Sequence, residues 1–140
     1  MPPIRTLEVF GEKIDVLVDG AMSNGAAFVM VQTTPPGGGP PPHSHSREDE
    51  TFTVLEGDFE LLKDGQWVKA PVGEILFAPR GNVHAFRNAG QTTGRIAVFI
   101  APAGLETFFE KLSGLSPATD MPRILELFAE YGLSLHLPTS

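Results

Sequence analysis

The chain contains no cysteine among its 140 residues. Disulfide bonds, thiolate metal ligands and a cysteine nucleophile are therefore excluded. Imidazole and carboxylate groups remain as the plausible ligands for a metal ion. The absence of cysteine leaves the redox compartment open.

Basic residues are scarce, with 10 Lys plus Arg against 17 Asp plus Glu and a formal net charge of -7. Nucleic-acid binding through phosphate neutralisation needs a basic face, and no basic helix-turn-helix segment is evident. The first residues lack the basic start and apolar run of a secretory signal, and no apolar run approaches membrane-spanning length. We therefore expect a cytoplasmic protein with a small-molecule ligand and with neither nucleic acid nor membrane as partner.

A chain of 140 residues with 41% hydrophobic content can bury one sizeable core but is too short for two ordinary domains. No internal repeat is apparent. We expect a single domain over residues 1–140. Its barrel should cover about 10–101, and a C-terminal helical segment should cover about 103–132.

Short strand-like runs recur between turn residues along most of the chain, and Asp64-Gly65 is the clearest hairpin turn. The predicted strands cover residues 13–18, 27–34, 51–55, 59–63, 66–69, 74–78, 83–87 and 95–101. So many short strands, separated by Gly, Pro and Asn, predict an all-β sandwich or barrel of the jelly-roll type.

Beyond the predicted barrel, the apolar residues change to helical spacing. They are Leu105, Phe108, Phe109 and Leu112, then Ile124, Leu125, Phe128 and Tyr131. Asp120 and Pro122 mark a helix start, and Gly132 marks its end. We expect short helices whose apolar faces pack on the barrel or on a partner subunit.

Three of the four histidines belong to a pattern that suits a metal ion. His43 and His45 are two residues apart, so both imidazoles project from one face if the segment is extended. Glu50 follows, and His84 lies far downstream. A histidine that only lies on the surface or in the core would not need two other histidines and a carboxylate in such a pattern. The pattern therefore favours a metal site.

Two spaced motifs contain these four residues. They read Gly37-x5-His43-x-His45-x4-Glu50-x6-Gly57 and Gly73-x5-Pro79-x-Gly81-x2-His84-x3-Asn88. Together they resemble the two motifs of the cupin superfamily at every position. The resemblance covers residues 37–88 and implies a double-stranded β-helix, which is a jelly-roll barrel.

By this resemblance, His43, His45, Glu50 and His84 correspond to the metal ligands of cupins. Glu50 is preferred to its acidic neighbours because its spacing to Gly57 fits the motif, although Asp49 fits a looser form of it. We expect Glu48 and Asp49 to be solvated. The ligand set suits Fe, Mn, Ni, Co, Cu or Zn, and it leaves two positions on a six-coordinate ion for water, dioxygen or a chelating substrate.

Aromatic residues near the ligands are candidates for a substrate pocket. Strand alternation places Phe52 on the side of Glu50 and Phe86 on the side of His84, and Phe77 is a third candidate. An apolar lining of this kind suits a flat aromatic or enol-containing compound. Plain barrel core is the alternative for each Phe.

Three further features lie outside the ligand motifs. Residues 35–42, rich in Pro and Gly, are expected to form an ordered loop at the barrel mouth; a linker or a proline-rich peptide ligand is the alternative. Arg80 and Arg87 can bind an acidic substrate, although solvated surface is the more common fate of arginine. His136 matches no motif and is left without a function.

The chain is similar to small, single-barrel cupins of the quercetinase-like kind. This resemblance implies a metal-dependent dioxygenase in which Glu50 acts as the base that removes a substrate proton. Two alternatives remain, an isomerase or lyase that uses the metal as a Lewis acid without oxygen, and a non-catalytic small-molecule-binding barrel. Similar cupins commonly dimerise, so we expect a homodimer.

Overall fold

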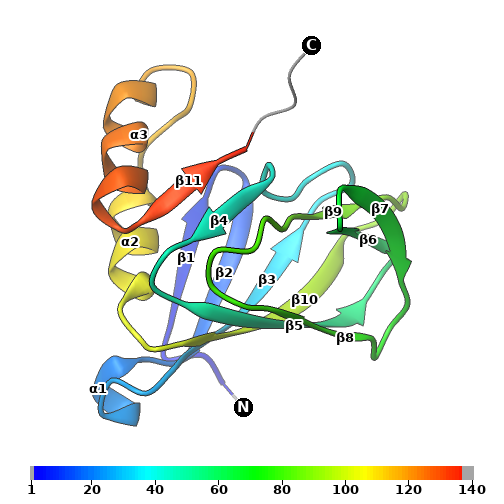
Figure 1. Cartoon of the computed structure of the whole chain (residues 1–140), viewed down its shortest axis with the longest axis horizontal. Helices are drawn as coiled ribbons and strands as arrows, with labels where there is room; N and C mark the ends of the chain where they lie inside the picture. Colours follow the sequence, from blue (N-terminus) through cyan, green and yellow to red (C-terminus); the bar gives the residue numbers. More distant parts are fainter. Residues whose placement is uncertain (1, 137–140) are drawn as a thin grey trace.

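The computed structural model describes residues 2–136, so both ends of the predicted domain, residue 1 and residues 137–140, lie outside the described part. Antiparallel strands form two facing layers, with two helices packed against one end of the barrel (Figure 1). The predicted all-β jelly-roll class is confirmed. No helix among residues 2–136 is long and apolar enough to cross a membrane.

The larger layer is a six-stranded sheet in the order β1-β2-β3-β10-β5-β8. Its strands are β1 (Arg5–Val9), β2 (Glu12–Val18), β3 (Phe28–Thr34), β10 (Gly94–Ala101), β5 (Asp49–Glu56) and β8 (Ile75–Ala78). The sheet starts at Arg5, earlier than the predicted barrel. The β1–β2 hairpin turns through Phe10 and Gly11, both of which have positive φ. Phenylalanine rarely adopts this conformation, so the sequence gives no indication of a turn at Phe10.

The opposite layer consists of a three-stranded sheet, β7-β6-β9, and a strand pair, β11-β4. Its strands are β4 (His43–His45), β6 (Phe59–Lys63), β7 (Gln66–Ala70), β9 (Phe86–Asn88) and β11 (Leu133–Leu135). The predicted Asp64-Gly65 hairpin turn joins β6 to β7. Strand β9 begins later than the predicted strand 83–87, because His84 makes only an isolated bridge to His43.

The core lies between the two layers, and strand alternation determines which residues enter it. On β10, Ile96, Val98 and Ile100 are buried, whereas Arg95 and Phe99 point outward. Each inward residue of β10 pairs with inward residues of β3 and β5 on either side. The inner face of the large sheet is therefore mostly apolar.

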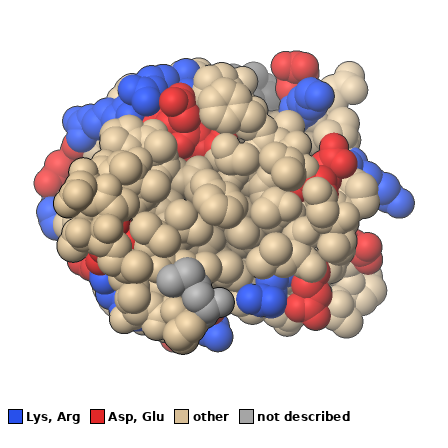
Figure 2. Space-filling view, turned by 90° about the horizontal axis from the view of Figure 1, so that it is seen from below, with Lys and Arg blue, Asp and Glu red and all other residues tan. Residues whose placement is uncertain are grey.

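The outer face of the same sheet also exposes large apolar side chains. Ile75, Phe77 and Phe99 are 69%, 59% and 47% exposed. Phe77 and Phe99 both pair with Thr51, so they share one face of β8, β5 and β10. Figure 2, a view from the side on which β5 and β8 lie in Figure 1, shows a broad uncharged area with charged residues mainly around its edge.

Helices α2 (Leu105–Leu112) and α3 (Met121–Glu130) form the predicted C-terminal helical segment. Leu105, Phe108 and Leu112 of α2, with Ile124 of α3, belong to the same buried cluster as the barrel core. Of the two predicted alternatives, the barrel or a partner subunit, these residues pack on the barrel, but Leu125 of the predicted face is 47% exposed. Three elements were not predicted: β1, the short α1 (Gly20–Ser23), and β11, which returns along β4.

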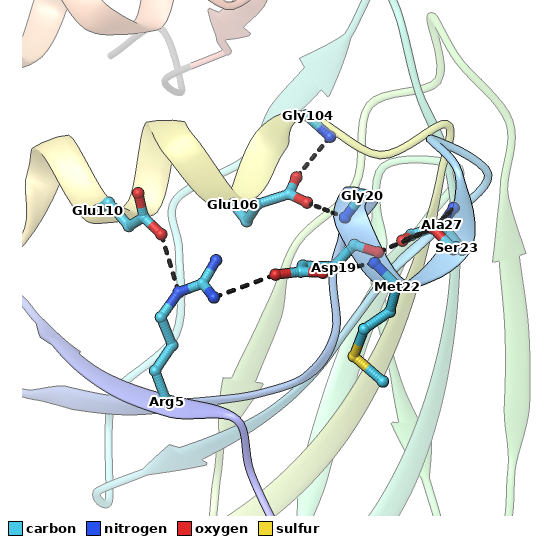
Figure 3. A network of polar contacts seen from close by, with 9 residues as sticks. All are labelled: Arg5, Asp19, Gly20, Met22, Ser23, Ala27, Gly104, Glu106 and Glu110. Carbon is cyan, nitrogen blue, oxygen red and sulfur yellow. Dashed lines mark hydrogen bonds and ion pairs between the residues drawn. The ribbon is translucent and has the colours of Figure 1, made fainter.

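A polar network joins α2 to the start of the barrel (Figure 3). The buried carboxylate of Glu106 accepts hydrogen bonds from the backbone N–H of Gly20, at 2.7 Å, and of Gly104, at 2.5 Å. Nearby, Arg5 forms ion pairs with Asp19 and Glu110. Glu106 therefore fixes the first turn of α2 against the loop that contains α1.

We expect Glu106→Ala to lower the free energy of unfolding by about 1 to 3 kcal/mol, because it leaves two partly buried N–H groups without their acceptor. Urea unfolding measures this loss. Glu110→Ala is the control on the same helix: the Glu110 side chain is 41% exposed, so the loss of its ion pair with Arg5 should stay below about 1 kcal/mol. Equal losses in the two variants would contradict this account of Glu106.

Candidate metal centre

Four side chains meet at one point inside the barrel. His43 and His45 lie on β4, Glu50 on β5, and His84 in the segment before β9. One donor atom from each lies within 4.8 Å of the others. His45, Glu50 and His84 are only 2%, 4% and 4% exposed, and His43 is half-buried. The structure therefore brings together all four predicted metal ligands.

Backbone pairing fixes these positions. The N–H of His43 donates to the His84 carbonyl at 3.0 Å, and the N–H of His84 donates to the His43 carbonyl at 2.9 Å. The N–H of Gly81 donates to the His45 carbonyl at 2.7 Å. On its other side, β4 pairs with β11 through all three of its residues. The segment is extended, as predicted, so His43 and His45 share a face.

Hydrogen bonds at Nδ1 orient two of the imidazoles. Nδ1 of His43 lies 2.9 Å from the carbonyl oxygen of Pro41, and Nδ1 of His84 lies 3.1 Å from that of Asn82. A carbonyl only accepts hydrogen bonds, so Nδ1 carries the proton in both rings. In the neutral imidazole Nε2 then carries the lone pair. Metal-ligating histidines are commonly held in this way.

The Nε2 atoms face a carboxylate instead of a donor. Nε2 of His84 is 2.5 Å from Oε2 of Glu50, and Nε2 of His45 is 3.3 Å from its Oε1. Neither Nε2 atom has a partner of hydrogen-bond geometry among the described residues. Neutral imidazole and carboxylate both offer lone pairs, so this contact needs a cation or a proton between them. The donor set fits a divalent metal ion.

The protonation of the cluster agrees with this reading. Burial, helped by the charge of His84, lowers the pKa of His43 to about 4, so His43 is neutral at neutral pH. Burial alone would raise the pKa of Glu50, but the close contact with His84 and the charges of His45 and His43 outweigh it and leave that pKa below its ordinary value. Neutral imidazole and ionised carboxylate are the forms that bind metal.

Glu48 was expected to be solvated, and this prediction is wrong. Its side chain is 6% exposed, and its Oε1 lies 3.4 Å from Nδ1 of His45. Glu48 thus lies behind the third imidazole at ion-pair distance, although the two atoms lack the hydrogen-bond geometry that Pro41 and Asn82 have with the other two. The spacing could have indicated this, because Glu48 and Glu50 are two residues apart and share a face if the chain is extended.

We expect Glu48→Leu to weaken metal affinity by about 10- to 100-fold, because outer partners of ligating histidines commonly contribute that much. Titration of the metal-free protein with Co(II), followed by absorption, measures the change. Glu56→Leu is the matched control, since Glu56 is an exposed residue at the far end of β5. An affinity that matches the control would show that Glu48 does not support the centre.

A largely apolar cavity of about 260 Å³ adjoins the cluster, and His43, His45 and Glu50 form part of its wall. Phe52 and Phe86 line it, as predicted. The helices supply further lining residues that were predicted only as packing faces: Phe108, Phe109, Leu112 and Phe128. Rings from the barrel and from the C-terminal segment therefore enclose the same space.

Phe77 does not line this cavity, so its assignment to the pocket is a wrong prediction. Its side chain is 59% exposed. In the pairing of β5 with β8, Glu50 lies opposite Ala78 and Thr51 lies opposite Phe77. Residues directly opposite each other share a face, so Phe77 points away from Glu50.

The two candidate arginines are engaged elsewhere. Arg80 pairs with Asp49, at 3.1 Å, and its hydrogen bonds lower the pKa of that carboxyl. Arg87 pairs with Glu60 at 2.7 Å and lies over the ring of Trp67. Neither arginine lines the cavity, so neither is placed to bind a substrate there.

The Pro/Gly-rich loop is an ordered part of the cavity wall. Pro35, Gly38 and residues 39–41 line the cavity. Gly39 packs so closely on β9 that a Cβ atom there would overlap the carbonyl oxygen of Phe86. His136 lies beside β4, where its Nε2 contacts Oγ of Ser44 at 2.9 Å. His136 is therefore close to the centre but outside it.

Comparisons with known proteins agree with the geometry. An uncharacterized protein of Aquifex aeolicus is 40% identical over 57 residues, which are 41% of this chain and 47% of that protein. The quercetin 2,3-dioxygenase of Bacillus subtilis is 29% identical over 103 residues, which are 73% of this chain and 30% of that protein. The chain thus spans less than half the length of either relative.

Among solved structures, an RmlC-like cupin from Shewanella frigidimarina superposes with a TM-score of 0.63 at 21% identity, covering 74% of this chain and 87% of that one. This likeness supports the fold. Residues 30–100, which include both motifs and all four donor residues, match the cupin domain family. The chain belongs to the cupin family.

Proposed function

We propose that this cupin is a metal-dependent dioxygenase that acts on a small aromatic or enolisable compound. The observation that carries the proposal is the convergence of four metal-binding side chains on the wall of an apolar cavity. The similarity to a quercetin 2,3-dioxygenase supports the oxidative reaction among those that such a centre can catalyse. One divalent ion, Fe, Mn, Ni, Co, Cu or Zn, would be held by His43, His45, Glu50 and His84.

When bound, such an ion supplies Lewis acidity and open positions for substrate and dioxygen. The residues of the chain orient the ligands, bind the substrate and exclude water. His43 and His84 are fixed in orientation through their Nδ1 hydrogen bonds. Phe52 and Phe86 pack against a flat substrate and exclude water.

Glu50 is the proposed general base. Its carboxylate lies at the cavity wall and is ionised because its pKa is below the ordinary value. It can accept the proton of an enol or phenol hydroxyl at one carboxylate oxygen, leaving the substrate as its more reactive anion. Glu50 is thus the proposed catalytic residue, and the two phenylalanines bind the substrate.

Elemental analysis of protein purified without chelators, followed by oxygen-uptake measurements, tests the proposal. We expect near-stoichiometric metal and oxygen consumption with 3-hydroxyflavone or catechol that disappears after metal removal. Zinc with turnover but no oxygen uptake would favour an isomerase or lyase. Stoichiometric ligand binding without turnover would indicate a binding protein, and either result would overturn the dioxygenase assignment.

The active form is proposed to be a homodimer. The exposed apolar residues Ile75, Phe77 and Phe99 lie on one outer sheet face, which suits burial against a second copy better than exposure to water. We expect wild-type protein to elute as a dimer in light-scattering chromatography and Phe77→Lys to elute as a monomer. Lys69→Glu is a charge-changing control on an exposed residue of β7. A monomeric wild type would contradict the proposal.

A further inference from the structure

The cavity contains a second polar group besides the metal ligands. Gln32 on β3 donates from Nε2 to Oε1 of Glu12 on β2 at 2.8 Å, and both side chains line the cavity. The described lining residues include five with polar side chains, which are Glu12, Gln32, His43, His45 and Glu50. The remaining lining residues are apolar side chains or glycine and proline of the loop.

Gln32 occupies a position that the strand pattern assigns to an apolar residue. It is 7% exposed and pairs with Ile14 on one side and Ile96 on the other, both of which are buried. A buried amide costs free energy unless its hydrogen bonds are made. The bond to Glu12 uses one N–H of the amide, so the other N–H and the carbonyl oxygen remain for a ligand.

We propose that Gln32 and Glu12 form a specificity site that binds a hydroxyl group at the end of the substrate farthest from the metal. A hydroxyl can donate to the second carboxylate oxygen of Glu12 and accept from the remaining N–H of Gln32. This two-point recognition suits a phenolic or alcoholic hydroxyl.

The sheet register gives the length that such a substrate needs. Glu50 pairs with Ile100, which pairs with Phe28, so Gln32 lies four residues farther along β3 and two strands away from Glu50. That corresponds to about 13 Å along the strands and about 10 Å across them between the backbones. Both side chains reach inward from these points, so one molecule that contacts both must be longer than a single ring.

This inference rests on the proposed function, because it assumes that the other end of the substrate binds at the metal. The test compares 3-hydroxyflavone with 3,4′-dihydroxyflavone, two probes that share the chelating group and differ by one distal hydroxyl. Each is titrated into metal-loaded protein without oxygen, and absorption reports binding. We expect wild-type protein to bind the dihydroxy compound about tenfold more tightly, the usual effect of a hydrogen bond to a charged group.

The variants Gln32→Leu and Glu12→Gln should each reduce this ratio while leaving metal content unchanged, and each ratio is taken against the variant's own affinity for 3-hydroxyflavone. Leucine suits the apolar neighbours of Gln32, so the variant should fold. A ratio of one in wild-type protein, or a ratio that both variants retain, would overturn the specificity site and leave the proposed function intact.

If neither flavonol binds to metal-loaded protein, the proposed substrate class is wrong, and the hydroxyl site must then be tested alone. Titration of metal-free protein with p-cresol, followed by NMR shifts, does this. Binding that is weakened in Glu12→Gln supports the site. Shifts that are the same in wild type and variant refute it.

Discussion

Substitution of His45 by alanine should abolish stoichiometric metal binding while the β fold remains. His45 is 2% exposed, and its two ring nitrogens face Glu50 and Glu48. The loss in affinity should exceed the roughly 100-fold upper range for outer partners, because a direct ligand is removed. Elemental analysis after dialysis against metal measures it, and circular dichroism monitors the fold.

His136→Ala is the matched control, because His136 contacts Ser44 next to His45 and lies outside the four-residue cluster. It should retain full metal content. Normal metal content in His45→Ala would contradict the ligand assignment. Loss of metal in both variants would point to general disruption around β4.

The second large effect is expected from Phe108→Ala, which should lower the free energy of unfolding by about 3 to 5 kcal/mol. Phe108 is 2% exposed and contacts the rings of Phe109, Phe128 and Tyr131. It also lines the cavity, so its loss enlarges that cavity. Chemical denaturation measures the stability, and 3-hydroxyflavone titration measures the effect on binding.

Leu125→Ala on α3 serves as the control for helix truncation, because Leu125 is 47% exposed. Its effect should stay within about 0.5 kcal/mol. If Phe108→Ala costs no more than the control, the C-terminal helices contribute little to the core. The cavity wall would then have to be attributed to the barrel alone.

The candidate metal centre was predictable because strand alternation pairs His43 with His45 and the resemblance to the cupin motifs adds Glu50 and His84. His43 and His45 share a face in any extended segment, and the motif spacing selects Glu50 and His84. The same alternation correctly placed Phe52 and Phe86 at the cavity. Glu48 was missed although it obeys the same rule, because the motif spacing selected Glu50 and its acidic neighbours were expected to be solvated.

Other features depend on long-range pairing that no local pattern reveals. The orientation of Phe77 follows from the register of β8 against β5. Strand β11 is three residues long and was not predicted, because its partner β4 lies about ninety residues earlier in the chain. The polar pair of Gln32 and Glu12 was also missed, since a single Gln in a strand gives no indication of its partner.

The pairing of β11 with β4 has a thermodynamic consequence. The strand that carries His43 and His45 is bonded on one edge to the last described strand of the chain and on the other to His84. A metal ion held by His43 and His45 would stabilise β4 and thereby favour its pairing with β11. By reciprocity, pairing of β11 would favour metal binding by the same factor. Strand β11 lies far from the four candidate ligands in sequence and would still influence the metal affinity of the barrel.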